Sequence, residues 1–154
     1  MTMRNTENHW GSPSKLLHWM TAVLILIQIP LGFYAEELKL SPLKLDLFVW
    51  HKSIGMLVLL LAAARLLWRI TGTIPITPDS GKVQRQLAQL AHALLYGLMI
   101  ALPISGWITT SAANIPTKLF WMIELPAITG PDEALKSLAD EVHEICVTML
   151  IIIL

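Results

Sequence analysis

A long uncharged run near the start of the chain constrains its fold more than any other feature. Residues 16–35 contain no Asp, Glu, Lys or Arg, and about 20 helical residues cross a hydrocarbon core of roughly 30 Å. A cleavable signal peptide has a shorter apolar core and a small-residue cleavage site, whereas this run ends in Tyr34, Ala35 and Glu36. We predict a retained transmembrane helix at about residues 14–35, in a single domain that covers residues 1–154.

Three further segments are predicted to be helical. The second covers about residues 46–70, and the third, about residues 84–110, lies within an uncharged stretch from residue 86 to 117. The fourth, residues 134–154, begins polar and becomes apolar only at Ile145, which leaves it shorter than a full span. With 55% hydrophobic and 14% charged residues, the composition is far from that of soluble proteins. We predict an all-α, integral membrane four-helix bundle whose fourth helix is incomplete.

The charges of the loops predict the orientation. Residues 65–85 contain four bases and one acid, whereas residues 118–144 contain two bases and six acids. Because basic loops remain in the cytoplasm, we expect the first of these loops and the N-terminus to be cytoplasmic. The formal net charge is zero, which gives no indication of nucleic-acid binding.

Four of the five histidines fall in or beside predicted helices, where a polar ring needs a metal, a proton path or a hydrogen-bond partner. His51 and His143 are expected at one depth near the outer ends of their helices, and His18 and His92 near the inner ends. Two histidines at one depth suit the two axial positions of haem iron. The chain has a single cysteine, which excludes covalent attachment through a CxxCH motif. We therefore predict non-covalent haem b.

The roles of three other residues have alternatives. His92 could line a quinone pocket, donate to a haem propionate, replace a ligand opposite His18, or only bond to a neighbouring helix. Gly55, one turn after His51, would clear space for a flat porphyrin. Arg69 either belongs to the excess of basic residues typical of cytoplasmic loops or pairs with a haem propionate or a semiquinone.

Several short segments, taken together, resemble the bacterial cytochrome b561 family. The similarity runs from about residue 12 to the end of the chain. It rests on residues 15–19, 50–55, 65–69, 91–96, 102–107 and 142–144. The resemblance implies a four-helix bundle in the bacterial inner membrane, with two b haems stacked across the bilayer.

The resemblance also implies a ligand set. His51 would pair with His143, and His18 with a second histidine of the fourth helix that would fall at position 157. The sequence ends at Leu154, so we expect a chain truncated within this helix. Its outer haem would have both ligands, and its inner haem only His18, unless His92 or a partner supplies the other.

Bis-histidine haem has no open iron position and therefore favours electron transfer over oxygen binding. The resemblance implies single-electron exchange between a periplasmic donor, for which superoxide is one candidate, and membrane quinone. The chain would then be a quinone-linked oxidoreductase surrounded by membrane lipid. The alternatives are a haem-bearing anchor for a periplasmic dehydrogenase or hydrogenase subunit, and a haem-free membrane scaffold. Assembly as a homodimer or with a partner subunit remains an alternative to a monomer.

Overall fold

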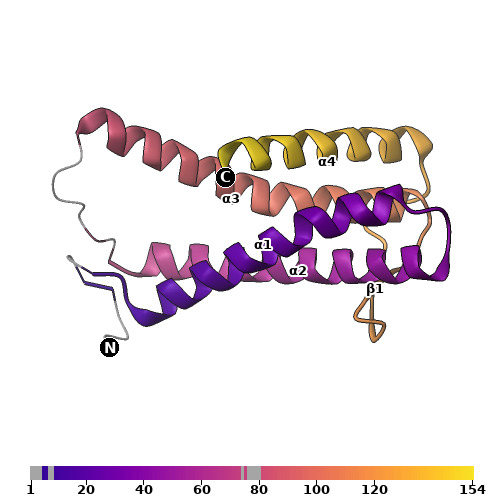
Figure 1. Cartoon of the computed structure of the whole chain (residues 1–154), viewed down its shortest axis with the longest axis horizontal. Coiled ribbons are helices and arrows are strands. Elements are labelled where there is room, and N and C mark those ends of the chain that lie inside the picture. The colour runs from indigo at the N-terminus through magenta and orange to yellow at the C-terminus, as the bar shows by residue number, and fades with distance from the viewer. Residues whose placement is uncertain (1–4, 7–8, 74, 76–80) are drawn as a thin grey trace.

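The computed structural model describes residues 5–6, 9–73, 75 and 81–154. Within them the helices run side by side along the long axis of the molecule (Figure 1). The elements in chain order are α1 Ser12–Glu37, α2 Pro42–Thr71, α3 Lys82–Ala112, β1 Thr117–Leu119, β2 Ile123–Leu125 and α4 Glu133–Ile153. The predicted helix ends differ from these by one to four residues.

Capping residues explain where two of the helices begin. The Ser41 hydroxyl accepts a hydrogen bond from the Lys44 backbone N–H at 3.3 Å, and Pro42 occupies the first helical position. Serine and proline favour these two positions, so α2 begins four residues earlier than predicted. In the same way, the Asp132 carboxylate accepts a hydrogen bond from the Leu135 N–H at 3.0 Å at the start of α4.

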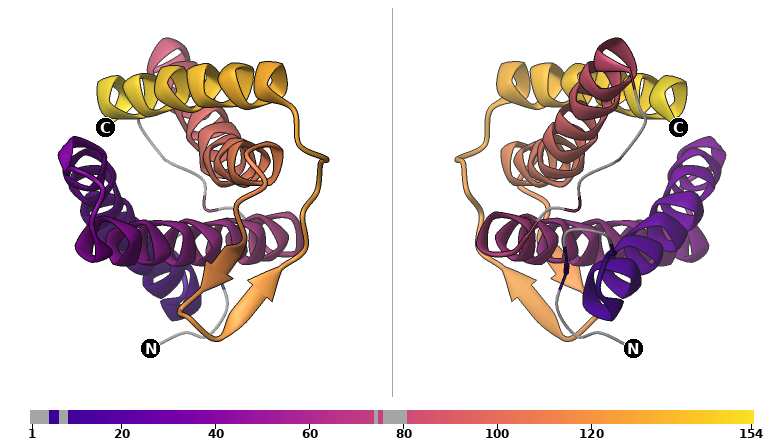
Figure 2. Two further views of the ribbon diagram at one scale, coloured as in Figure 1. Left: turned by 90° about the vertical axis from the view of Figure 1, so that its right-hand side faces the viewer. Right: turned by 90° about the vertical axis from the view of Figure 1, so that its left-hand side faces the viewer.

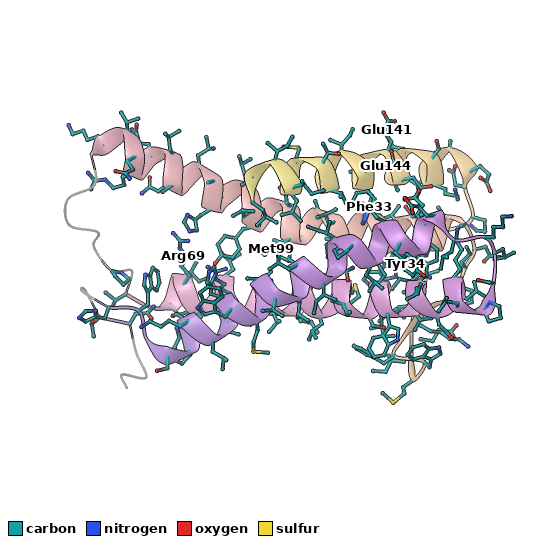
Figure 3. All side chains as sticks on the ribbon, viewed as in Figure 1. Phe33, Tyr34, Arg69, Met99, Glu141 and Glu144 are labelled. Atoms are coloured by element: carbon teal, nitrogen blue, oxygen red, sulfur yellow. The ribbon has the colours of Figure 1, made fainter. Side chains whose placement is uncertain are left out.

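The helices pack in chain order, with α1 on α2, α2 on α3 and α3 on α4 (Figure 2). All four contribute to a buried apolar core midway along the bundle, where Met99 lies in Figure 3. This core consists of Ile25, Val58, Ala62, Leu98, Met99 and Leu150. Away from it, large apolar side chains are exposed on every helix, as expected for a surface that faces lipid.

Among the residues that the structure describes, three helices, α1, α2 and α3, are long and apolar enough to cross a membrane. They contain 26, 30 and 31 residues, which correspond to about 39 to 46 Å of helix. This exceeds a hydrocarbon thickness of roughly 30 Å, so the helix ends extend into the headgroup layers. The structure confirms an all-α membrane bundle.

Charged side chains divide the bundle into two ends, which we call the acidic end and the basic end. Glu141 and Glu144 lie toward the first in Figure 3, and Arg69 toward the second. The acidic end carries nine acids and five bases: Glu36, Glu37, Asp46, Glu124, Asp132, Glu133, Asp140, Glu141, Glu144, Lys39, Lys44, Lys52, Lys118 and Lys136. The basic end carries Lys15, Arg65, Arg69, Lys82 and Arg85 and, among the described residues, no acid.

The connection between α3 and α4 contains a β-hairpin that the sequence analysis did not predict. β1 and β2 pair antiparallel, and Met122 donates a backbone hydrogen bond to Leu119 at 3.0 Å across the turn. The two central residues, Phe120 and Trp121, have φ angles of 49° and 59°. Turns of this kind favour Asn and Gly, because a bulky residue at positive φ costs about 1–3 kcal/mol. Contacts with the bundle must therefore stabilise the turn.

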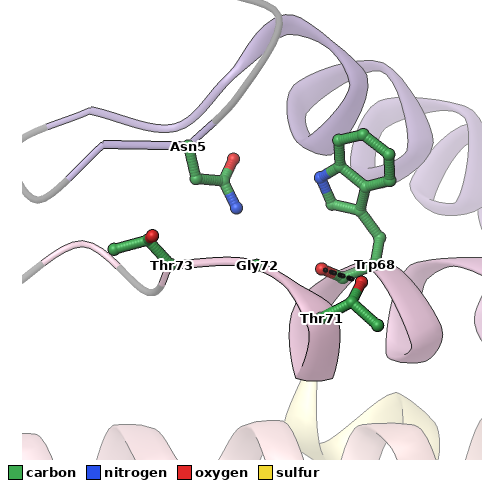
Figure 4. Close-up of a pocket in the computed structure, with 5 residues that line it drawn as sticks. All are labelled: Asn5, Trp68, Thr71, Gly72 and Thr73. Carbon is green, nitrogen blue, oxygen red and sulfur yellow. Dashed lines mark hydrogen bonds between the residues drawn. The ribbon is translucent and has the colours of Figure 1, made fainter.

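A small polar hollow lies at the basic end, beside the end of α2 (Figure 4). Asn5 forms one side of it, and its side-chain oxygen accepts hydrogen bonds from the Gly11 N–H at 2.9 Å and the Ser14 hydroxyl at 2.7 Å. These bonds attach the segment before α1 to the first turn of that helix. The lining residues are Asn5, Trp68, Thr71, Gly72 and Thr73, so the hollow is separate from the histidines.

Candidate functional site

His51 of α2 and His143 of α4 face each other near the acidic end. Their ring centroids are 6.3 Å apart. Elsewhere in the described residues α2 and α4 make few direct contacts, so the two rings meet across the space between these helices. The structure thus brings together the two histidines that the sequence analysis expected at one depth.

Helix α1 contacts His51 at two points. The Gln28 side-chain amide donates a hydrogen bond to the His51 backbone carbonyl at 2.7 Å. Four residues later, Gly32 faces the ring, and a Cβ atom there would lie 2.7 Å from the His51 Cε1. On α2 the partner glycine is Gly55, where a Cβ atom would lie 3.3 Å from the Gln28 Nε2. Residues four apart share one helix face, so each helix offers a glycine to the polar side chain of the other. We call these four residues the α1–α2 clasp.

The clasp gives Gly55 a contact in addition to the role expected for it. Gly55 is predicted to clear space for a porphyrin, and the structure places the Gln28 amide against this position. Neither Gln28 nor Gly32 was predicted to belong to the site. The available signal was Gln28 itself, because an amide inside an apolar span needs a hydrogen-bond partner.

On the other side of the pair, α3 orients His143. The Ser105 hydroxyl donates a hydrogen bond to the Leu102 carbonyl at 2.9 Å, and its oxygen lies 2.9 Å from the His143 Nδ1. A hydroxyl has one hydrogen, so the Ser105 oxygen accepts from the His143 Nδ1–H. This tautomer leaves Nε2 with a free lone pair, as a metal ligand requires. The next residue, Gly106, also faces the ring, at 3.5 Å from Cε1 to an added Cβ atom.

His18 of α1 and His92 of α3 lie at the basic end. Near them, the Arg65 guanidinium lies 5.5 Å from the centre of the Tyr96 ring. Both histidines are exposed, and the His92 Nδ1 is hydrogen-bonded to a carbonyl of its own helix. In the part of the chain that the structure describes, no ring contact joins them like that between His51 and His143.

Comparison with known proteins identifies the family of this chain. A sequence profile described as prokaryotic cytochrome b561 matches residues 9–154. The chain belongs to this family. Cytochrome b561 homolog 2 of Escherichia coli (strain K12) is 28% identical over 151 residues, which cover 93% of this chain and 77% of that protein. The cytochrome b561 family consists of membrane proteins that bind haem b and transfer electrons.

The ring pair of this family member fits haem iron. Two imidazoles on opposite sides of one metal, each at about 2 Å, have ring centres roughly 6 Å apart, close to the 6.3 Å between His51 and His143. A bare ion would need further ligands, and no third His, Cys, Asp or Glu of the described residues joins the pair. A porphyrin supplies the remaining four nitrogens itself.

The position of Arg69 restricts the role predicted for it. Arg69 follows His51 on the same helix by 18 residues, which is about 27 Å along the axis. It therefore cannot contact a group held between His51 and His143. If Arg69 pairs with a haem propionate, that haem would lie at the end that carries His18.

Proposed function

We propose that this cytochrome b561 family member passes single electrons between a donor at the acidic end and a quinone in the membrane. His51 and His143 would hold one haem b, and His18 is a proposed ligand of a second. The observation that carries the proposal is the 6.3 Å approach of the His51 and His143 rings. Bound haem supplies a one-electron redox couple, and its iron has no free coordination position when two histidines hold it.

The protein's own contribution is to orient the ligands and to exclude water. The clasp positions the His51 ring, and Ser105 holds the His143 tautomer that leaves Nε2 free. The apolar core around Val58 and Met99 lies between this pair and the basic end. Such a dry interior keeps the polarity around a redox group low, which is one of the properties that set its potential.

We further propose that the acidic end faces the periplasm. The five bases and the absence of acids among the described residues of the basic end match the cytoplasmic side of a membrane protein. The acidic end has an excess of four negative charges, nine acids against five bases. A negative surface attracts cations and repels anions. The charge therefore favours a positively charged donor, or a protein with a basic surface, over the superoxide anion.

Spectroscopy of the purified protein tests the haem assignment. The wild type is expected to show a reduced b-type α-band. His51→Ala and His143→Ala should each lose the contribution of one and the same haem to this band. His18→Ala should retain that haem's contribution, and His9→Ala, a change before α1, should retain the whole spectrum. Full haem content in His51→Ala would contradict the proposal.

The choice of donor is tested by mediator charge. Reduction of the protein by a cationic ruthenium complex and by an anionic mediator of similar potential is compared at low and high ionic strength. The cation should react faster at low salt, and the difference should shrink as the Debye length falls from about 30 Å at 0.01 M to about 3 Å at 1 M. A faster reaction of the anion at low salt would support superoxide instead.

A further inference from the structure

The tip of the β1–β2 hairpin carries three exposed, large apolar side chains. Trp121, Met122 and Ile123 are 48%, 82% and 58% exposed. Figures 1 and 2 show the hairpin projecting sideways from α2, on the side away from α4. We propose that this tip binds the interfacial layer of the lipid bilayer at the acidic end. The proposal does not depend on haem binding.

Contacts with α2 hold the tip at one level of the bundle. The Phe120 N–H donates a hydrogen bond to the Ser53 hydroxyl at 2.7 Å. The Trp50 ring packs edge-on against the rings of Phe120 and Trp121, with centroids 5.8 and 5.4 Å apart. The Trp121 indole N–H donates to the Asp46 carboxylate at 3.3 Å. These contacts overcome the unfavourable φ angles of the turn and tie it to the second to fourth turns of α2.

This level coincides with the edge of the apolar span. On α2, charged residues occur up to Lys52, and none follows until Arg65. On α4, the last charged residue is Glu144. The contact between His51 and His143 places these two transitions side by side. The hairpin therefore lies where polar headgroups meet hydrocarbon.

The chemistry of the hairpin matches such a layer. Strand residues alternate between two faces, and Thr117 is buried against the bundle. Lys118 and Glu124, which pair across the strands, therefore point away from it. Tryptophan is enriched at membrane interfaces because it combines an apolar ring with an N–H that needs a partner. The hairpin thus presents charges on one face and an apolar tip.

The face of α2 that runs from the hairpin toward the basic end is also suited to contact lipid. Trp50 and Trp68 are both exposed and are 18 residues apart, which is five turns and about 27 Å. They therefore share one face of α2, at a separation close to the roughly 30 Å hydrocarbon thickness. The apolar tip of the hairpin extends this lipid-facing strip at the acidic end of the bundle.

A second copy of the chain is the alternative occupant. A stable protein interface involves roughly 20–30 residues on each side, whereas the tip offers three large apolar side chains. The continuity with the strip between Trp50 and Trp68 favours the bilayer.

Spin labels in lipid nanodiscs test the proposal on the whole chain. Cys146 is the only cysteine, so a Cys146→Ala background accepts one new cysteine at a time, Met122→Cys or the matched Lys118→Cys. Both positions are exposed, so labelling should preserve the fold. The label at 122 should be relaxed several-fold more by oxygen than by a water-soluble nickel chelate, and the label at 118 should show the opposite order. Equal access of the chelate to both labels would overturn the proposal, as would dipolar broadening at 122, which would identify a second copy.

Discussion

The His51 ring lies directly over Gly32, with no room between them for a methyl group. A Cβ atom on Gly32 would stand 2.7 Å from the ring Cε1, closer than a van der Waals contact permits. One turn earlier on α1, Gln28 is hydrogen-bonded to the backbone of the same histidine. Helix α1 therefore orients a proposed iron ligand that belongs to α2.

We expect Gly32→Ala to displace the His51 ring and lower haem retention. Adding a methyl group to a packed position costs about 1–3 kcal/mol. The haem-to-protein ratio and the low-spin EPR signal measure the displacement. Gly97→Ala is the matched control, since nothing lies within 4 Å of an added Cβ atom there. Equal effects of the two substitutions would show that the ring contact is unimportant.

Gln28→Leu should separate ligand positioning from stability. The substitution removes a hydrogen bond worth about 1 kcal/mol, but it also removes the buried Oε1, which has no partner among the described residues and whose burial costs about 1–3 kcal/mol. These effects oppose each other, so the melting temperature should change little. Haem transfer to excess apomyoglobin should accelerate, because His51 loses one restraint. Gln89→Leu, at an exposed position of α3, should transfer haem at the wild-type rate. An unchanged rate in Gln28→Leu would disprove the positioning role.

Ser105→Ala should weaken haem binding through His143. The hydroxyl oxygen that accepts from the ring Nδ1–H is lost, and losing such an outer partner typically reduces metal affinity 10–100-fold. The reduction potential should also shift, because the Nδ1 hydrogen bond affects how strongly Nε2 donates. Thr148→Ala removes an exposed hydroxyl that bonds only within α4, and it should leave affinity and potential unchanged. A wild-type potential in Ser105→Ala would mean that this bond does not tune the site.

Ser53→Ala should release the hairpin from α2. It leaves the Phe120 N–H without its acceptor at 2.7 Å, and an unpaired buried group costs about 1–3 kcal/mol. Hydrogen exchange of residues 117–125 should become faster, while exchange in the middle of α3 should not change. Ser137→Ala, on an exposed surface of α4, serves as the control. Wild-type protection of the hairpin in Ser53→Ala would indicate that the aromatic contacts alone hold it.

The histidine pair could be predicted because depth along a helix follows from counting residues. Each residue advances the helix by 1.5 Å, so approximate helix ends were enough to place His51 and His143 at one level. The hairpin could not be predicted in this way. Its turn lacks the Asn-Gly or Asp-Gly pair that marks such turns in a sequence, and it forms because Trp50 and Ser53, distant in the chain, stabilise Phe120 and Trp121 at positive φ.

The sequence by itself determined that this protein spans a membrane, that its charges separate into two ends, and which histidines share a level. These properties depend on hydropathy and on position along each helix. Only the tertiary structure decided that Gly32 receives the His51 ring, that Gln28 occupies the space at Gly55, and that Ser105 orients His143. Those relationships depend on how each helix is rotated about its axis, and side-chain packing between neighbouring helices sets that rotation.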